Sequence, residues 1–347
     1  IEMLIKLKNK TAIGPKQPTF IIAEAGINHN GKLSLAYKLV DEAVKCGVNA
    51  IKFQTFKTEH VIRKNCPRPS HEIKNLKENI SHFDLVKRWE LSFSDFEKIK
   101  KYCEKKKIIF FSTPGDIISA NFLIKIKCPI IKIASADMLN FPMLEIIGKS
   151  KIPLILSTGM SRWQEINQSV NFFLNLSKKL VILKCTSNYP ASSKSLNING
   201  IKKIQSFFPS SIVGLSDHSS GLEATYAAVA LGAKVVERHF TLDKKMWGPD
   251  HIASLDSSDL KELVKGIRKI ENSLGTYSWN VQTEELSQRR VMQKGTYASK
   301  SITKGKKIKI KDVSFLRPSN GMSPMKFYLK KMNRKSNKNY SEGDSIV

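Results

Sequence analysis

Short apolar runs recur through the first 240 residues of the chain, and segments with helical periodicity separate them. The runs predict buried parallel strands, because they are short, rich in Ile and Val, and do not alternate with polar residues. Eight such runs are present: Phe20–Ala23, Ala50–Phe53, Ile108–Phe111, Ile130–Ile133, Leu154–Leu156, Val181–Leu183, Ile212–Leu215 and Val235–Val236. Eight strand–helix units predict an α/β fold, a closed (β/α)8 TIM barrel, with a doubly wound open sheet as the alternative.

The connecting segments carry apolar residues at helical spacing. Leu33–Cys46 predicts a helix that Gly47 ends, and Asp256–Leu274 predicts the last helix of the series. The longest connection, residues 56–91, separates the second and third predicted strands, and its length is typical of a functional loop. Three segments have the spacing of a capping box near their start, namely Ser94 with Glu97, Ser161 with Gln164, and Ser220 with Glu223.

A polar, turn-rich stretch follows the last predicted helix, and the chain changes character beyond it. The remainder consists of short strand-like runs, turns and many Lys residues. We therefore predict a barrel domain over residues 1–280 and a small, mostly β domain over residues 281–347. A domain of that size has a small core, so we expect it to dock on another surface.

The chain is strongly basic, with 58 Lys and Arg against 30 Asp and Glu and a net charge of +28. The excess is mostly Lys and is spread along the chain, although residues 295–347 hold 13 basic and 3 acidic residues. No aromatic nucleic-acid-binding motif accompanies it. We expect a Lys-rich surface and no specific nucleic acid, with a polyanion-binding protein on an inactive barrel as the alternative. A positive field would also favour an anionic small substrate.

The cysteines and the apolar runs predict a cytoplasmic protein. The five cysteines are odd in number and form no CxxC pair, which argues against a disulfide framework and a Cys-ligated zinc site. No stretch of 18 apolar residues is present, so no membrane span is expected. The first ten residues lack the pattern of a signal peptide.

All eight predicted strands end in polar residues, which is where a barrel carries its active site. Lys52, Lys132 and Lys184 lie within or directly after apolar runs. A single such lysine usually extends to solvent, but three on alternate strands favour an anion site, for example for phosphate and carboxylate together.

His218 and His239 follow neighbouring predicted strands. Two imidazoles at adjacent strand ends are candidate ligands of one metal with open positions, and a hydrogen-bonded or general-base role is the alternative. The ligand type alone favours zinc or another transition metal. Asp217, Glu237 and Asp250 are expected to orient the imidazoles.

Three further side chains at the strand ends have candidate roles. Glu24 is a candidate general base or sugar ligand, and a salt bridge to one of the lysines is the alternative. Tyr189 is expected either to pack against other side chains of the protein or to form a hydrogen bond to a ligand at the barrel mouth. Cys185 has no evident activating partner and is interpreted as a buried thiol.

In this order along the chain, the strand-end segments resemble the sialic acid synthases, the N-acetylneuraminate synthase family. The matching segments are Ile22–Gly31, Lys52–Thr55, Ser112–Pro114, Lys132–Ser135, Leu156–Met160, Cys185–Ala191, Gly214–His218, Glu237–Thr241 and Gly248–His251. The tail segment Arg317–Pro324 resembles the signature of the family's C-terminal antifreeze-like (SAF) domain. The resemblance covers nearly the whole chain.

The resemblance implies a metal-dependent condensation of phosphoenolpyruvate with the open-chain aldehyde of N-acetylmannosamine. Water adds, phosphate leaves by C–O cleavage, and N-acetylneuraminate remains. The metal would be Mn²⁺, or another divalent ion such as Mg²⁺ or Co²⁺, held by His218 and His239. On this point the resemblance favours manganese over the zinc that the ligand type alone suggests. Glu24, Asp137, His218 and His239 would be catalytic. The implied substrate-binding residues are Lys52, Gln54, Thr113, Lys132, Ser135, Ser187, Tyr189, Ser216, Asp250 and Arg317.

The resemblance also implies a domain-swapped homodimer. The small domain of one subunit would cover the barrel mouth of the other and place Arg317 near the N-acyl group of the sugar. Such a lid would explain why a small basic domain is retained.

The chain departs from the family pattern at three places. Asp137 stands where relatives often have Glu, and Gly115 stands where a Phe is frequent, which is expected to widen the mouth. The Asn that reaches the sugar from the long loop has three candidates, Asn65, Asn75 and Asn79. Two other enzyme activities are alternatives: a synthase of legionaminic or another nonulosonic acid, and a metal-dependent pyruvate aldolase.

Overall fold

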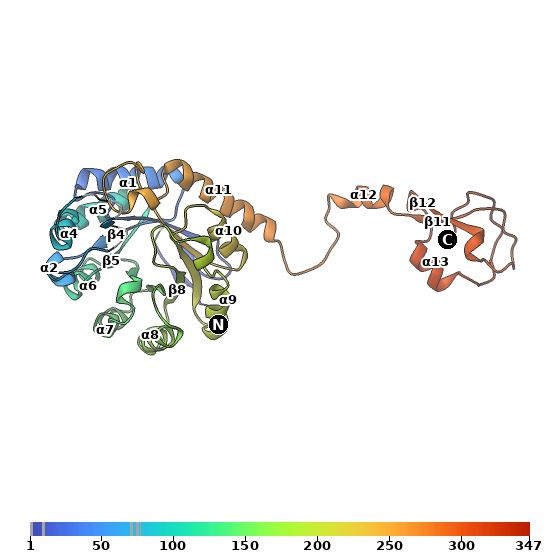
Figure 1. Ribbon diagram of the computed structural model, residues 1–347. Coiled ribbons are helices and arrows are strands. Elements are labelled where there is room, and N and C mark those ends of the chain that lie inside the picture. Colours follow the sequence, from blue (N-terminus) through green and yellow to red (C-terminus); the bar gives the residue numbers. More distant parts are fainter. Residues whose placement is uncertain (1–2, 9–10, 70–71, 74–75, 77) are drawn as a thin grey trace. The chain divides into compact units, whose positions relative to one another are not determined.

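The computed structural model describes residues 3–8, 11–69, 72–73, 76 and 78–347, and the chain divides into two compact units (Figure 1). The first unit extends to Gly275 and the second comprises Thr276–Val347. This division lies slightly before the predicted boundary at residue 280, because the helix of the first unit ends at Leu274 and exposed residues such as Tyr277 and Trp279 follow it.

In the described part of the first unit, eight parallel strands close into a barrel. These strands are β3 (Phe20–Gly26), β4 (Ala50–Thr55), β5 (Ile109–Pro114), β6 (Ile131–Ile133), β7 (Leu154–Ser157), β8 (Leu180–Cys185), β9 (Ile212–Asp217) and β10 (Val235–His239). Each strand pairs with the next, and β10 pairs with β3. The prediction of a (β/α)8 barrel is therefore confirmed, and the open-sheet alternative is wrong because the last pairing leaves no edge.

Helices surround this barrel. They are α1 (Leu33–Cys46), α5 (Phe93–Lys105), α6 (Ile117–Lys125), α7 (Phe141–Ser150), α8 (Trp163–Leu176), α9 (Gly200–Phe207), α10 (Glu223–Ala230) and α11 (Ser257–Leu274). The first has the predicted bounds, and Gly47 ends it with a φ of 77°. The last ends at Leu274 as predicted but begins one residue later, because Asp256 is its N-cap. The long connection after β4 includes the short helices α2 (Thr58–Val61) and α4 (His82–Trp89).

The predicted capping boxes are wrong by one or two residues at all three helices. Ser92, not Ser94, caps α5 by accepting a hydrogen bond from the backbone N–H of Asp95. At the start of α8, the backbone N–H of Arg162 donates to Glu165. The N-cap of α10 is Leu222, which carries no capping side chain.

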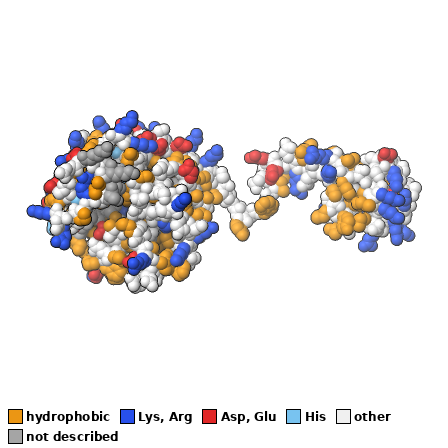
Figure 2. Space-filling view, in the orientation of Figure 1, with side chains coloured by type: hydrophobic (Ala, Val, Ile, Leu, Met, Phe, Trp, Pro, Cys, Tyr) orange, Lys and Arg blue, Asp and Glu red, His pale blue; other side chains and the backbone are white. Residues whose placement is uncertain are grey.

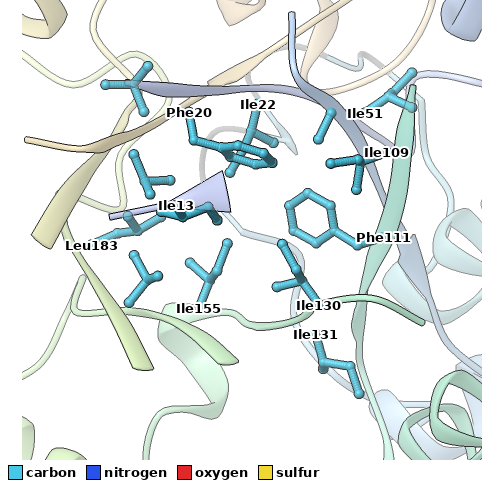
Figure 3. Packing of buried hydrophobic residues seen from close by; sticks show 14 of the residues in the cluster. Ile13, Phe20, Ile22, Ile51, Ile109, Phe111, Ile130, Ile131, Ile155 and Leu183 are labelled. Atoms are coloured by element: carbon cyan, nitrogen blue, oxygen red, sulfur yellow. The ribbon is translucent and has the colours of Figure 1, made fainter. Parts of the chain in front are cut away.

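The barrel interior changes from apolar to polar along each strand. Alternate strand residues point inward, and at the amino-terminal end Ile13 of the hairpin formed by β1 (Ile5–Lys6) and β2 (Ala12–Ile13) lies among Phe20, Ile22, Ile155 and Leu183 (Figure 3). Two residues further along the same strands, the inward positions hold Glu24, Ser157 and Cys185, which line a cavity. The apolar end is therefore filled, and the polar end is free to form a site.

The second unit is a small region built around one antiparallel pair, β11 (Gly295–Ala298) with β12 (Val313–Leu316). Its described helices are α12 (Glu285–Met292) and α13 (Pro324–Lys330). It has its own core, formed by Ala298, Ile302, Ile308, Val313, Phe327, Tyr340 and Ile346. A small, mostly β region after the barrel agrees with the prediction, and its identification as an antifreeze-like domain stays a prediction.

Two global features bear on the sequence-based expectations. Figure 2 shows Lys and Arg side chains scattered over the visible face of the first unit, without a continuous basic stripe. Among the described helices, none combines the length and apolar character that crossing a bilayer requires.

Candidate active site

A cavity of about 540 Å³ opens at the carboxyl ends of the barrel strands. Most residues predicted for the site line it: Glu24, Lys52, Gln54, Thr113, Lys132, Ser135, Asp137, Ser187, Tyr189, Ser216, His218 and His239. Asp250 lies beside it, with its Oδ2 atom 3.8 Å from His239 Nδ1. Arg317 belongs to the second unit, where its guanidinium donates to Met292 Sδ.

Four buried charges form the floor of the cavity. Lys52 Nζ lies 2.6 Å from Glu24 Oε2 and 3.8 Å from Glu237 Oε2. Lys132 Nζ lies 3.4 Å from Glu237 Oε1. Thr113 Oγ1 accepts a hydrogen bond from Lys52 Nζ at 2.7 Å. Two ammonium groups and two carboxylates thus balance one another in the barrel mouth, which confirms the salt bridge weighed for Glu24.

The environments of the two carboxylates differ. Burial raises the pKa of Glu24, although Lys52 opposes that effect. Glu237 is equally buried, but Lys132, Lys52 and a hydrogen bond from Ser216 hold its pKa at about 2. Glu237 therefore stays ionised, whereas burial makes Glu24 the more readily protonated of the two carboxylates. Such a separation assigns different acid–base roles to two neighbouring carboxylates.

Glu237 is a residue that sequence reasoning misplaced, since it was expected to orient an imidazole. It points inward two residues before His239, and inward neighbours along a strand share one face. Its partners are therefore the lysines of the floor. The spacing of two from His239 is the sequence signal that could have identified it.

Lys184 does not join the anion site, contrary to the prediction. It is half-buried, and its Nζ donates to the backbone oxygen of Cys185 and to Thr186 Oγ1. Its alkyl chain lies against Gly200 of α9. Because Cys185 occupies the inward position, its neighbour Lys184 faces the helical layer.

The two imidazoles predicted as metal ligands lie together at the cavity. The ring centroids of His218 and His239 are 5.3 Å apart. His218 Nδ1 is 2.9 Å from the backbone oxygen of Thr186, a contact that leaves Nε2 as the free nitrogen of that ring. His239 Nδ1 is buried without a hydrogen-bond partner among the described residues. Burial, with the nearby His218, lowers the pKa of His239 well below its usual value, so this imidazole stays neutral.

This donor set fits a metal with open positions. Within the part of the chain that the structure describes, no group of three His, Cys, Asp or Glu side chains could hold a metal ion. A metal at His218 and His239 would therefore take its other ligands from water or substrate oxygens.

The acidic neighbours of the imidazoles behave differently from one another. Asp217 was expected to orient an imidazole, but it points outward and accepts from buried Arg238 at 2.6 Å. Asp250 lies near His239, and burial together with Glu24 raises the pKa of Asp250 to about 7.

Cys185 has a partner that the sequence did not reveal. Its Sγ lies 3.8 Å from His218 Nδ1 and 3.9 Å from Ser187 Oγ. Burial would raise the pKa of the thiol, but the contact with His218 lowers that pKa to about 7. The interpretation of Cys185 as a buried thiol is confirmed, but the expectation that it has no activating partner is wrong, because strand β8 turns it toward the imidazole that follows strand β9.

A ring of hydroxyl groups completes the floor. Ser135 Oγ accepts from the backbone N–H of Gly159, and a side chain at Gly159 would collide with Ser135 Oγ and Ser187 Oγ. Ser157 Oγ is buried and has no hydrogen-bond partner among the described residues. Sequence reasoning did not select Ser157, although it shares the inward face with Ile155. Donors beside two lysines suit a phosphate or carboxylate group.

The departures from the family pattern have local consequences. Gly115 does not widen the mouth freely, because Phe56 and Val61 would lie 3.0 Å from a Cβ atom at that position. Asn75 lies outside the described residues, and neither Asn65 nor Asn79 is among those that line the cavity. Asp137 lines the cavity, and burial raises its pKa.

Asn30 holds the segment that presents Asp250. Its Nδ2 donates to the backbone oxygen of Trp247 at 2.8 Å, and its Oδ1 lies 3.2 Å from His251 Nε2. Ser254 Oγ donates to the backbone oxygen of Asp250. Hydrogen bonds from the loop after β3 therefore position the loop after β10.

Replacing Asn30 by Gly removes these contacts and keeps the left-handed backbone, whose φ is 49°. If Asp250 contacts the acceptor sugar, the variant raises the KM for that sugar about tenfold and leaves the KM for the anionic substrate unchanged, because each lost hydrogen bond contributes about 1 kcal/mol. Steady-state kinetics with each substrate varied in turn measures the two constants. Equal changes in both would contradict a specific positioning effect.

Two buried histidines that do not line the cavity, His29 and His251, make stability pH-dependent. Burial lowers the pKa of His29 and of His251 to about 4. The unfolded chain takes up these protons near pH 6.5, so stability is complete above that pH and is lost as the pH falls from about 6.5 toward 4. We expect the urea midpoint to fall between pH 7 and pH 5. His29→Gln should show a smaller fall, and exposed His60→Gln should behave like the native chain.

Comparisons with known proteins agree with this geometry. A protein-family model described as the NeuB family matches residues 39–278. The N,N'-diacetyllegionaminic acid synthase of Legionella pneumophila is 37% identical, covering 90% of this chain and 88% of its own length. The N-acetylneuraminate-9-phosphate synthase of Homo sapiens is 35% identical, covering 84% and 81%. A crystal structure of N-acetylneuraminic acid synthetase from Leptospira borgpetersenii in complex with citrate is 35% identical with a TM-score of 0.73, covering 83% of this chain and 95% of that one.

Proposed function

Because the chain belongs to the NeuB family, we propose that it is a phosphoenolpyruvate-dependent nonulosonic acid synthase. It joins phosphoenolpyruvate to the open-chain aldehyde of an N-acyl hexosamine and releases a nine-carbon 2-keto acid and phosphate. The observation that carries the proposal is one cavity in which two buried lysines and several hydroxyl groups face two imidazoles.

The charged floor binds phosphoenolpyruvate. Lys52 and Lys132 neutralise its carboxylate and phosphate, and the surrounding hydroxyl groups donate to their oxygens. These hydroxyl groups belong to Thr113, Ser135, Ser157, Ser187 and Ser216. Glu237 holds both ammonium groups in place, because it lies within 4 Å of each.

The reaction forms a C–C bond and breaks a C–O bond. C3 of phosphoenolpyruvate attacks the aldehyde carbon, water adds to C2, and phosphate leaves with the bridging oxygen. Glu24 is the general base that takes a proton from the incoming water, because its pKa is raised while that of Glu237 is not. Gln54 donates to Glu24 Oε1 at 3.2 Å and orients it. Tyr189, Asp137 and Asp250 contact the sugar.

His218 and His239 would hold a divalent metal, Mn²⁺ by preference or Mg²⁺ or Co²⁺. When bound, the metal polarises the aldehyde oxygen and stabilises the negative charge that develops there. The neutral state of His239 supports this role, since a protonated imidazole cannot bind a metal.

The acceptor and the assembly belong to the same proposal. N-acetylmannosamine, which would give N-acetylneuraminate, is the first candidate acceptor that the family resemblance implies. The similarity to the Legionella enzyme makes an acceptor for legionaminic acid the second candidate. The protein would act in the cytoplasm as a domain-swapped homodimer, with Arg317 of an antifreeze-like domain near the N-acyl group of the sugar.

The test follows both products in one assay with purified protein, MnCl2, phosphoenolpyruvate and N-acetylmannosamine or a 2,4-diacetamido-trideoxyhexose. Equal amounts of phosphate and 2-keto acid, both lost with EDTA, support the proposal. A 2-keto acid made from pyruvate without phosphate would identify an aldolase instead. If no acceptor gives product, and salt-dependent DNA binding persists in Lys52 variants, the polyanion-binding alternative would be favoured.

A further inference from the structure

The cavity has an apolar wall opposite in character to its charged floor. We define this apolar wall as Ile27, Phe56, Val61, Val86 and Trp89, all of which line the cavity. Apart from the indole N–H of Trp89, which is buried, these side chains consist of hydrocarbon. Polar hydroxyl groups of a substrate would find no partner on them.

The wall is continuous and separate from the barrel core. Ile27, Phe56 and Trp89 belong to one buried cluster, against which Val86 packs. Val61 adjoins this cluster. A Cβ atom added at Gly115 would lie 3.0 Å from Phe56 and 3.0 Å from Val61, so both side chains pack against this glycine. Any side chain at Gly115 would push them apart. The loops after β3 and β4 together with α4 therefore form the wall, and Gly115 allows it to close up.

The position of the wall assigns it to the acceptor. Phosphoenolpyruvate needs the lysines of the floor, and the aldehyde needs the imidazoles on β9 and β10. Strand β10 pairs with β3, and β3 pairs with β4. An acceptor that begins at the imidazoles and avoids the floor extends over these strands toward the wall.

We infer that the apolar wall selects an acceptor whose far end carries methyl or acyl groups in place of hydroxyls. This inference rests on the proposed function and narrows its acceptor. A hydroxyl group pressed against hydrocarbon loses its hydrogen bonds to water, whereas a methyl group gains contact area. A single such group changes specificity by about 10- to 100-fold. The preferred acceptor is then a deoxygenated, acylated hexosamine, and N-acetylmannosamine is a poorer one.

The test compares two acceptors that differ by one oxygen, N-acetylmannosamine and its 6-deoxy analogue, with a 2,4-diacetamido-2,4,6-trideoxymannose as the third. Phosphate release gives kcat/KM for each with the full-length protein. We expect kcat/KM for the 6-deoxy sugar to be at least tenfold higher than kcat/KM for N-acetylmannosamine. The value for the diacetamido sugar should equal or exceed that for the 6-deoxy sugar. Equal values for the first pair, or a preference for the hydroxylated sugar, would overturn the inference and leave the synthase proposal intact. If none of the three acceptors gives phosphate release, the synthase proposal itself would be overturned.

A matched pair of variants separates the wall from general effects of substitution. Val61 is 44% exposed, so Val61→Thr adds a hydroxyl of similar shape without disturbing a core. Val44 on α1 is 36% exposed and does not line the cavity, so Val44→Thr is the control. We expect Val61→Thr to reduce the preference for the 6-deoxy sugar several-fold and Val44→Thr to leave it unchanged. An unchanged preference in Val61→Thr would contradict contact between Val61 and the sugar.

Discussion

Replacing Lys52 by Met lowers kcat/KM about 10³-fold and also destabilises the barrel. Lys52 Nζ lies between Glu24 and Glu237, and its side chain is only 3% exposed. Without it, two buried carboxylates share Lys132 and repel an anionic substrate. Removing one partner of a buried ion pair costs about 3–5 kcal/mol, which corresponds to a fall of about 10 °C in melting temperature for a domain of this size.

Two comparisons make this result specific. Lys184→Met is the matched control, because Lys184 also follows an apolar run but faces away from the cavity. We expect that variant to keep kcat/KM within about threefold, since its two hydrogen bonds contribute about 1 kcal/mol each to folding rather than to catalysis. The double change Glu24→Gln with Lys52→Met restores charge balance, so it should recover melting temperature without recovering activity. Equal losses in Lys52→Met and Lys184→Met would contradict the assignment of the floor.

Replacing His239 by Ala abolishes tight binding of Mn²⁺ and lowers kcat/KM about 10³-fold. His239 supplies one of only two imidazoles at the cavity in the described part of the chain, so its loss leaves His218 as a single protein ligand. Stabilisation of a developing oxyanion by a metal contributes several kcal/mol to the barrier, which corresponds to at least this factor.

Calorimetric titration of the apoprotein with MnCl2 measures the binding directly. The native protein and His60→Ala, a change at an exposed residue of α2, should bind one ion with the same affinity. His218→Ala and His239→Ala should each bind at least about 100-fold more weakly. Full activity after EDTA treatment, or unchanged binding in either cavity variant, would show that these imidazoles act without a metal.

The hydrophobic pattern was sufficient to predict the barrel and the place of its site. The short apolar runs fell on the eight strands, and the polar residues after them became the lining of one cavity. The prediction succeeds because the carboxyl ends of parallel strands lie at the same end of the barrel. Residues such as Lys52 and His218 therefore come together there regardless of loop conformation.

The pattern could not decide which face of a strand points inward. In an amphipathic strand, polar residues mark the outside, but a strand of a barrel is covered by helices outside and by other strands inside. Both faces of β8 are therefore apolar, and Lys184 and Cys185 looked equally suited to the interior.

The sequence by itself therefore determined the order of the strands, the barrel they form and the chemical character of its mouth. Only the tertiary structure decided that Glu237 links the two lysines, that Cys185 contacts His218, and that Gly115 lets Phe56 approach Val61. The contacts of Glu237 with the two lysines and of Cys185 with His218 join residues that are 33 to 185 positions apart, and strand register and loop packing set them. A local pattern carries no information about either, because both follow from closing the sheet around one shared core.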